Sequence, residues 1–226
     1  MLGAECVVPG AFRVARCGVR HVGGSILVAL TLGVAHTAVA QTPAKIVVTS
    51  ATLKEGETIP RQYTPDGRND SPPLTWTAVP ASAKELAVIC EDPDAGNPPP
   101  FVHWVVYKIP ATAKGLPEAL PIDAATKMPA DLTGAVQGTN GFRRAIYRGP
   151  APPPGKPHHY HFVVYALDAP VASKPGQPPL TRAELLDAMK GHIVGQGELV
   201  AIYERTGPAQ PEAPAGRGRG RGRGGN

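Results

Sequence analysis

The stretch LAVICEDPDAGNPPPFVHWVVYKI, residues 86–109, decides the fold class of this 226-residue chain. Its two ends, 86–91 and 101–109, are rich in β-branched and aromatic residues, which favour β-strands. Pro93 and the run 98–100 separate these ends, and proline cannot donate a hydrogen bond to a neighbouring strand. The stretch therefore predicts two strands joined by an irregular connection.

Further short apolar runs follow the same pattern along the chain. Proline and glycine, 27 and 26 residues, make up more than a fifth of the sequence and separate these runs densely. Short apolar runs between frequent turns are typical of mostly β proteins. Further strands are expected at 45–50, after the proline-fixed segment 71–76, at 160–167 and at 199–203.

One helix is expected near the C-terminal end of the domain. Thr181 has the character of a helix N-cap, and Glu184 lies three residues later, which completes a capping box. The helix is expected over 183–189 and to end near Gly191. These elements predict one domain at 41–207.

The N-terminal segment 1–40 has the features of an export signal. Its basic residues end at Arg20, an apolar stretch covers 22–35, and the small residues 38–40 fit cleavage before Gln41. A membrane anchor is the alternative, but the apolar stretch is shorter than the roughly 20 residues of a membrane span. We expect a periplasmic or secreted protein.

The net charge of +5 comes from the two ends of the chain. Three basic residues lie in 1–40 and four in 208–226, with one acidic residue in each, which leaves 16 of each sign in 41–207. A neutral body gives no indication of a nucleic-acid-binding face on the folded domain. The segment 208–226, rich in proline and alanine and then Arg-Gly, is expected to be disordered. It is either an anion- or RNA-attracting segment or a solvated extension.

Cleavage before Gln41 would remove Cys6 and Cys17, so Cys90 would be the only cysteine of the mature chain and no internal disulfide is expected. Cys90 lies in a strand-like run beside Glu91 and Asp92. Neighbouring carboxylates oppose the low thiol pKa that a nucleophile needs. Cys90 is therefore expected to be a buried, small apolar residue.

Four polar islands interrupt the apolar pattern, and polar groups at such positions are costly to bury unless they are paired or bind something. They are Asp92-Pro93-Asp94, His103-Trp104, Gly149-Pro150 and His158-His159-Tyr160. The two aspartates flank a proline at a strand end, where a loop can aim both carboxylates the same way. Gly149 lies in a stiff loop that can present backbone N–H groups to an anion.

Side chains alternate between the two faces of a strand, which sorts the residues of these islands. His158 and Tyr160 are expected on one face, with His159 and His161 on the other. On the strand at 101–109 the same rule predicts that one face carries Phe101, His103, Val105 and Tyr107, and the other Val102, Trp104 and Val106.

The order and spacing of these motifs resemble the phosphatidylethanolamine-binding protein (PEBP) family, in particular its bacterial branch labelled Raf kinase inhibitor-like. The resemblance spans roughly 46–206 and rests on Asp-Pro-Asp-Ala at 92–95, Phe-Val-His-Trp at 101–104, Tyr-Arg-Gly-Pro at 147–150, His-x-Tyr at 158–160, and the segments 69–76 and 203–205. His159 departs from the family pattern, which usually has arginine at this position.

The resemblance implies a mostly β fold, an antiparallel β-sandwich of a large and a small sheet with a few peripheral helices. It also implies a small surface pocket for phosphate-like anions and phospholipid headgroups. Carried over residue by residue, the pocket consists of Asp92, Asp94, His103, Gly149, Pro150, His158 and Tyr160. The imidazoles would donate hydrogen bonds to anionic oxygens, more strongly when protonated. Asp92 would orient an imidazole or receive an ammonium group, and Tyr160 would offer its hydroxyl.

The expected function is non-catalytic binding of a phosphate-like or phosphoethanolamine-like ligand, without a cofactor and with membrane contact at most peripheral. Three alternatives stay open. Imidazoles and carboxylates of the same islands are the ligand types of a metal site. An acid–base hydrolase is another, although no Gly-x-Ser-x-Gly elbow is present and, apart from threonines, Ser71 and Ser82 are the only nearby hydroxyl candidates for a nucleophile. The third is a regulator that contacts a protein partner, such as an enzyme, in the cell envelope.

Overall fold

The computed structural model describes residues 42–96, 98–121, 128–173 and 176–206. The expected signal at 1–40 and the expected disordered segment at 208–226 lie outside these residues, so both stay predictions. The elements in chain order are β1 (Ala44–Lys45), β2 (Val47–Thr49), the 3₁₀ turn η1 (Arg61–Tyr63), β3 (Leu74–Thr77), β4 (Glu85–Asp92), β5 (Phe101–Pro110), β6 (Gly115–Leu116), the 3₁₀ turn η2 (Ala130–Leu132), β7 (Val136–Gln137), β8 (His158–Leu167), α1 (Arg182–Met189) and β9 (Ile193–Tyr203).

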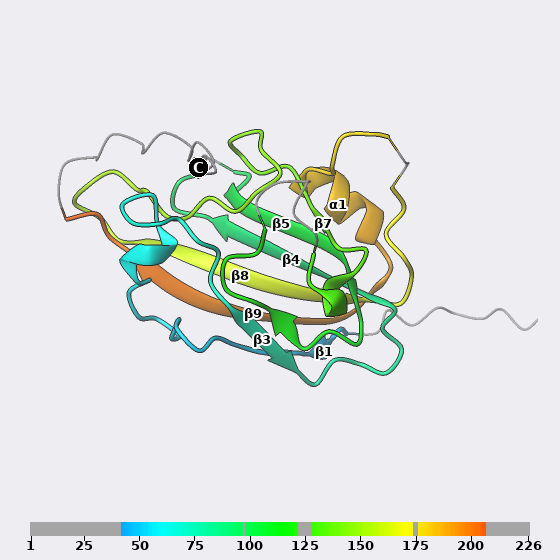
Figure 1. Cartoon of the computed structure of the whole chain (residues 1–226). Helices are drawn as coiled ribbons and strands as arrows, with labels where there is room; N and C mark the ends of the chain where they lie inside the picture. Colours follow the sequence, from blue (N-terminus) through cyan, green and yellow to red (C-terminus); the bar gives the residue numbers. More distant parts are fainter. Residues whose placement is uncertain (1–41, 97, 122–127, 174–175, 207–226) are drawn as a thin grey trace, which may run out of the picture. The chain divides into compact units, whose positions relative to one another are not determined.

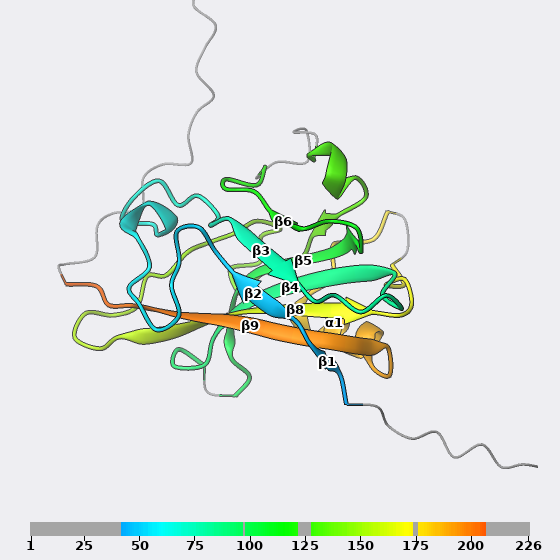
Figure 2. The same cartoon turned by 90° about the horizontal axis from the view of Figure 1, so that it is seen from below.

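Two sheets form the body of the fold, as expected for a sandwich of a large and a small sheet. The large sheet has the strand order β1-β9-β8-β4-β5-β7, and the small sheet has the order β2-β3-β6. All pairs are antiparallel except the short pair of β1 with β9, which is parallel. Figure 2 shows the small sheet lying across one face of the large sheet, on the side opposite α1.

Each face of the large sheet carries its own hydrophobic core. The core toward the small sheet, here the sandwich core, joins residues of both sheets, among them Trp76, Trp104 and Phe162. The core under α1, here the helix core, joins Ile89 and Val105 to Leu185 and others. Cys90 is fully buried in the sandwich core, and burial raises the pKa of its thiol well above the usual value. The expectation that Cys90 acts as a small apolar residue is confirmed.

The helix forms as its capping signal predicts. The Thr181 hydroxyl accepts a hydrogen bond from the Glu184 backbone N–H, while the Glu184 carboxylate accepts one from the Thr181 backbone N–H. On the face of the large sheet under α1, the helix residue Arg182 donates to the carboxylate of Glu91 on β4. Among the described residues, no helix is both long and apolar enough to cross a bilayer.

A β-bulge in β5 breaks the alternation expected for this strand. Cys90 faces Trp104 across the β4–β5 pair, whereas Glu91 faces Val102, so His103 is an extra residue without a partner of its own. Trp104 consequently packs in the sandwich core and Val105 in the helix core. The prediction that His103 shares a face with Val105 and opposes Trp104 is therefore wrong.

The last strand is longer than expected. The structure extends β9 to Ile193–Tyr203, where the sequence predicted only 199–203. The added residues include two glycines with polar neighbours, which lack the apolar pattern of a strand. They pair with β8 nonetheless, because Gly197 faces Val164 and Gly195 faces Ala166 in register.

Candidate ligand-binding site

Asp92 and His158 form the centre of the candidate site, at the end of the large sheet where β4 and β9 finish and β5 and β8 begin (Figure 1). The Nδ1 of His158 lies 2.8 Å from Oδ2 of Asp92. Oδ1 of Asp92 accepts hydrogen bonds from the backbone N–H groups of Asp94, at 2.8 Å, and Ala95, at 3.0 Å. Because an ionised carboxylate only accepts, Nδ1 of His158 carries the hydrogen and Nε2 is left for another partner.

His103 reaches the same face as His158 because of the bulge in β5. Its Nδ1 lies 2.7 Å from the carbonyl oxygen of Arg148, and a carbonyl only accepts, so Nδ1 donates here. Burial lowers the pKa of His103 below its ordinary 6.5, against weaker raising effects from the Arg148 carbonyl and Asp92. His103 is therefore neutral at neutral pH, and in that form its Nε2 accepts a hydrogen bond rather than donating one.

Tyr160 lies in the sandwich core, on the same face of β8 as His158. Its ring packs edge-on against His103, with the ring centroids 5.2 Å apart. The side chain is fully buried, yet its hydroxyl has no hydrogen-bond partner among the described residues. Burial, reinforced by the nearby Asp92 carboxylate through its charge and as a hydrogen-bond acceptor beyond ordinary bonding geometry, raises the pKa of this hydroxyl, so it stays protonated and able to donate. Burying a hydroxyl without a hydrogen-bond partner costs free energy of folding. The Tyr160 hydroxyl is such a group, and the ring that carries it contacts His103.

Gly149 and Pro150 are both buried beside His103, in the loop that precedes β8. A Cβ at Gly149 would lie 1.9 Å from the carbonyl oxygen of Tyr63, so only glycine fits this close approach. The backbone N–H of Gly149 donates to Oδ1 of Asn69 at 2.9 Å. Asn69 therefore already accepts a hydrogen bond from the N–H group that was expected, from the sequence, to bind an anion.

Asp94 has a different partner from Asp92. Oδ2 of Asp94 accepts from the backbone N–H of His159 and lies 2.8 Å from its Nδ1, and both side chains are about half exposed. The Asp94 carboxyl has a lowered pKa, mainly because of these two contacts. The two aspartates flanking Pro93 thus hold neighbouring histidines of β8 that point to opposite faces. The predicted alternation of His158 and Tyr160 against His159 is confirmed by the burial pattern of β8.

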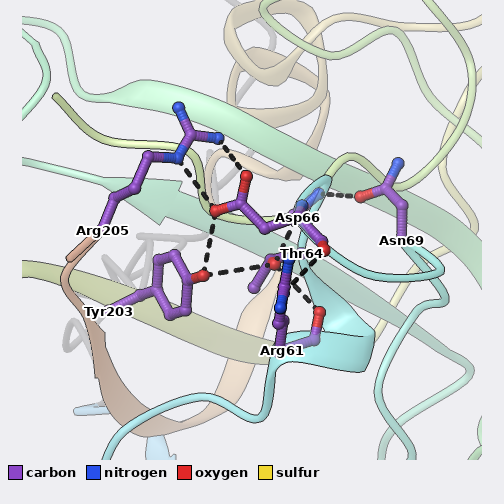
Figure 3. A network of polar contacts seen from close by, with 7 residues as sticks. Arg61, Thr64, Asp66, Asn69, Tyr203 and Arg205 are labelled. Carbon is purple, nitrogen blue, oxygen red and sulfur yellow. Dashed lines mark hydrogen bonds and ion pairs between the residues drawn. The ribbon is translucent and has the colours of Figure 1, made fainter. Parts of the chain in front are cut away.

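A second polar network, centred on Asp66, lies next to the site and was not predicted from the sequence. Arg205 donates to both carboxylate oxygens of Asp66, at 2.9 and 2.8 Å, and the Tyr203 hydroxyl donates to Oδ2 at 3.0 Å (Figure 3). Nε of Arg61 donates to the backbone oxygen of Asp66 at 2.7 Å. This Asp66 network ties the turn that holds Asn69 to the end of β9. The only sequence signal for it is Asp-Gly at 66–67, which is typical of any turn.

The described residues bear on two of the alternative functions, the metal site and the hydrolase. Within the described ranges, no three His, Cys, Asp or Glu side chains are grouped so that they could hold a metal ion. Ser71, one of the two hydroxyls considered for a hydrolase, accepts a hydrogen bond from the backbone N–H of Leu120 and is buried there. Among the described residues, no serine or threonine hydroxyl is hydrogen-bonded to a histidine.

Comparisons with known proteins identify the family of this chain. The family model described as phosphatidylethanolamine-binding protein matches residues 49–204. A UPF0098 protein of Methanothermobacter thermautotrophicus is 44% identical over 147 residues, 65% of this chain and 91% of the relative. A UPF0098 protein of Pyrococcus abyssi is 41% identical over 164 residues, 71% of this chain and 86% of the relative.

Solved structures show the same relationship. Escherichia coli YbcL, described as a new member of the mammalian PEBP family, is 37% identical with a TM-score of 0.64, covering 72% of this chain and all of that one. A PEBP homologue from Chlamydia trachomatis is 33% identical with a TM-score of 0.61, covering 73% of this chain and 99% of that one. The family resemblance of the sequence is thereby confirmed, and the chain belongs to the phosphatidylethanolamine-binding protein family.

Proposed function

We propose that this chain is an exported, non-catalytic protein that binds a small anionic ligand or a phospholipid headgroup at the site formed by Asp92, His103, His158 and Tyr160. The unpartnered, buried hydroxyl of Tyr160 carries the proposal. Folding leaves few such groups unpaired, and a phosphate oxygen is a suitable acceptor. The neighbouring pair of Asp92 and His158 supplies both signs of charge when His158 is protonated.

The fixed Nδ1 hydrogens of the two histidines give the site a defined pH dependence. His103 and His158 each donate from Nδ1 to the protein, so their Nε2 atoms donate to an anion only in the imidazolium form. Because the pKa of His103 is lowered by burial, its donor form is present in acid and is lost as the pH rises through a value below 6.5. Binding of the anion should weaken with it.

Calorimetric titration with inorganic phosphate and with phosphoethanolamine, at about pH 5 and about pH 7.5, tests the site. We expect tighter binding at the lower pH and loss of binding in His103→Ala. His161→Ala is the matched control, because His161 lies on β8 on the face opposite to His158 and pairs with the exposed Glu198. No heat with either ligand, or equal loss in the control variant, would refute the assignment.

Export rests on the apolar stretch 22–35 and the small residues 38–40. Sequencing the N-terminus of the protein recovered from cells is expected to give Gln41 as the first residue. Recovery of a protein that retains residues 1–40 in the cytoplasmic fraction would contradict this part of the proposal.

A further inference from the structure

A tight turn at 140–144 lies beside the candidate site, and its backbone is fixed by Asn140. The buried Asn140 side chain accepts hydrogen bonds from the backbone N–H groups of Phe142, at 2.9 Å, and Arg144, at 3.1 Å. Its amide donates to the carbonyl oxygen of Ile146 at 2.8 Å. These bonds hold Arg143 at a φ of 61°, which is uncommon for a residue other than glycine. The turn is thus preorganised.

This turn presents an unusual set of side chains to solvent. Phe142 is 38% exposed, and Val47 is the only other large hydrophobic residue that is exposed in the described part of the chain. Arg143 and Arg144 are exposed as well, and neither forms an ion pair with a described residue. We call these three residues the Phe-Arg-Arg lip.

The lip is contiguous with the candidate site through aromatic contacts. The Phe142 ring packs edge-on against Phe101 at 4.9 Å and against His103 at 6.0 Å between centroids. The guanidinium of Arg148 lies over the Phe142 ring, 4.5 Å from its centroid. The Arg148 carbonyl oxygen also accepts a hydrogen bond from Nδ1 of His103. Arg148 therefore contacts both the lip and the site.

We propose that the Phe-Arg-Arg lip docks this protein onto an anionic lipid surface. The inference deepens the proposed headgroup binding and rests on it. One aromatic ring followed by two exposed arginines that pair with no described residue matches the boundary of a bilayer, where aromatic rings sit at headgroup level and basic residues attract anionic lipids. A single exposed ring is too small for the hydrophobic centre of a protein interface, which favours lipid over a protein partner. Docking would bring His103 to the level of the headgroups.

Sedimentation of the full chain with vesicles tests the contribution of charge. Arg143→Gln with Arg144→Gln should weaken binding to phosphatidylcholine vesicles containing phosphatidylglycerol on the order of 30-fold, because each arginine near an anionic surface contributes about fivefold. The matched control removes two charges at the opposite end of the large sheet, in Lys84→Gln with Lys190→Gln, and should bind as the unchanged protein does. Equal weakening in both double variants would overturn the proposal, as would equal binding to vesicles of phosphatidylcholine alone.

Tryptophan quenching by brominated lipids tests insertion and is independent of any binding by 208–226. The native Trp76 and Trp104 are buried, so a tryptophan introduced at an exposed position reports on its own surroundings. Phe142→Trp should be quenched by brominated anionic vesicles, and Val47→Trp, at the other exposed hydrophobic position, should not. Quenching of both introduced tryptophans, or of neither, would overturn the proposal. Binding to a soluble polyanion that is as strong as binding to the vesicles would overturn it as well.

The two proposals fail in different ways. Titration with soluble phosphoethanolamine reports on the site, and the arginine double variant should leave that affinity unchanged. If the soluble ligand does not bind while the lip variants still lose vesicle binding, the headgroup site is wrong and the docking surface stands. If the soluble ligand binds while the lip variants keep full vesicle binding, the docking surface is wrong.

Discussion

Asp66 and Asp92 are two carboxylates with little exposure that lie near the same end of the large sheet, and their partners differ. The side chain of Asp66 is 8% exposed and is held by Arg205 and Tyr203 (Figure 3). The side chain of Asp92 is 2% exposed and is held by His158 and two backbone N–H groups. Arginine keeps its charge at every relevant pH, whereas histidine changes its charge near neutrality.

This difference in partners assigns Asp66 to the stability of the fold and Asp92 to the candidate site. The pKa of the Asp66 carboxyl is lowered, mainly by its hydrogen bonds from Arg205, so the pair stays ionised across the physiological range. Next to Asp92, in contrast, stand a titratable imidazole and the unpartnered hydroxyl of Tyr160. Polar groups that are fully satisfied fix a structure, and those left incomplete beside them mark the place where a ligand is expected.

The largest effect is expected from Asp66→Asn, which removes the charge opposite Arg205. An arginine left without its partner at a site with little exposure should cost about 3 kcal/mol of the free energy of unfolding, measured by urea denaturation at neutral pH. Because the folded pKa of Asp66 is lowered, its contribution is present above the ordinary value of 3.8 and is lost as the pH falls through the lower folded value. The difference between the two proteins should therefore shrink in acid.

Asp168→Asn serves as the control for this experiment. Asp168 pairs with His192 at the surface, with both side chains more than 40% exposed, and its loss should cost less than about 0.5 kcal/mol. If both substitutions cost the same, the Asp66 network does not stabilise the fold in the way described.

Asp92→Asn is expected to cost less, about 1 kcal/mol, because the remaining oxygen can keep the two backbone hydrogen bonds. The new amide group donates toward Nδ1 of His158, which must then accept, so the ring hydrogen should move to Nε2. Nitrogen NMR of the histidine rings would detect this change, with His161 as the internal reference. A His158 ring that keeps its hydrogen on Nδ1 would contradict the described pairing.

Tyr160→Phe should leave stability unchanged or raise it by less than about 1 kcal/mol, because the hydroxyl it removes makes no hydrogen bond of ordinary geometry with a described residue. The same substitution should weaken binding of phosphoethanolamine about tenfold, the contribution of one hydrogen bond to an anion. Thermal unfolding and calorimetric titration of the one variant measure both. A marked loss of stability would show that the hydroxyl is hydrogen-bonded within the protein.

The smallest effect is expected from Asp94→Asn, less than about 0.5 kcal/mol, since Asp94 and His159 are both about half exposed and screened by solvent. The Asp94 pKa is lowered by the backbone N–H and then the ring of His159, so what stability it gives is lost as the pH falls below 3.8. Unfolding compared at neutral pH and in acid checks this. An effect as large as that of Asp92→Asn would place Asp94 in the structural core of the site.

The sequence predicted those features that depend on local patterns. The strands β4, β5 and β8 lie where apolar runs end at prolines or polar residues, and α1 begins at the expected capping box. Alternation along β8 correctly placed His158 and Tyr160 on one face, because no bulge interrupts β8 in that stretch. The convergence of Asp92 with His158 followed from the family resemblance rather than from spacing.

What the sequence could not supply depends on contacts between distant segments. The partner of Asp66 lies 139 residues away, and nothing in the turn around Asp66 indicates it. The requirement for glycine at 149 comes from the backbone of Tyr63, a close approach that no local pattern records. The bulge at His103 likewise arises from pairing between β4 and β5, since the sequence of β5 alone is equally compatible with regular alternation.

The bulge at His103 is an insertion that leaves the pairing of β5 with β4 in register on both sides of it. On both sides of the extra residue, β5 keeps the faces that β4 sets, because Val102 lies opposite Glu91 and Trp104 lies opposite Cys90. Removing His103 would therefore leave Phe101, Val102 and Trp104 opposite their present partners on β4 and on their present faces. A single residue thus lets the site end of this strand vary without disturbing the interior that supports it.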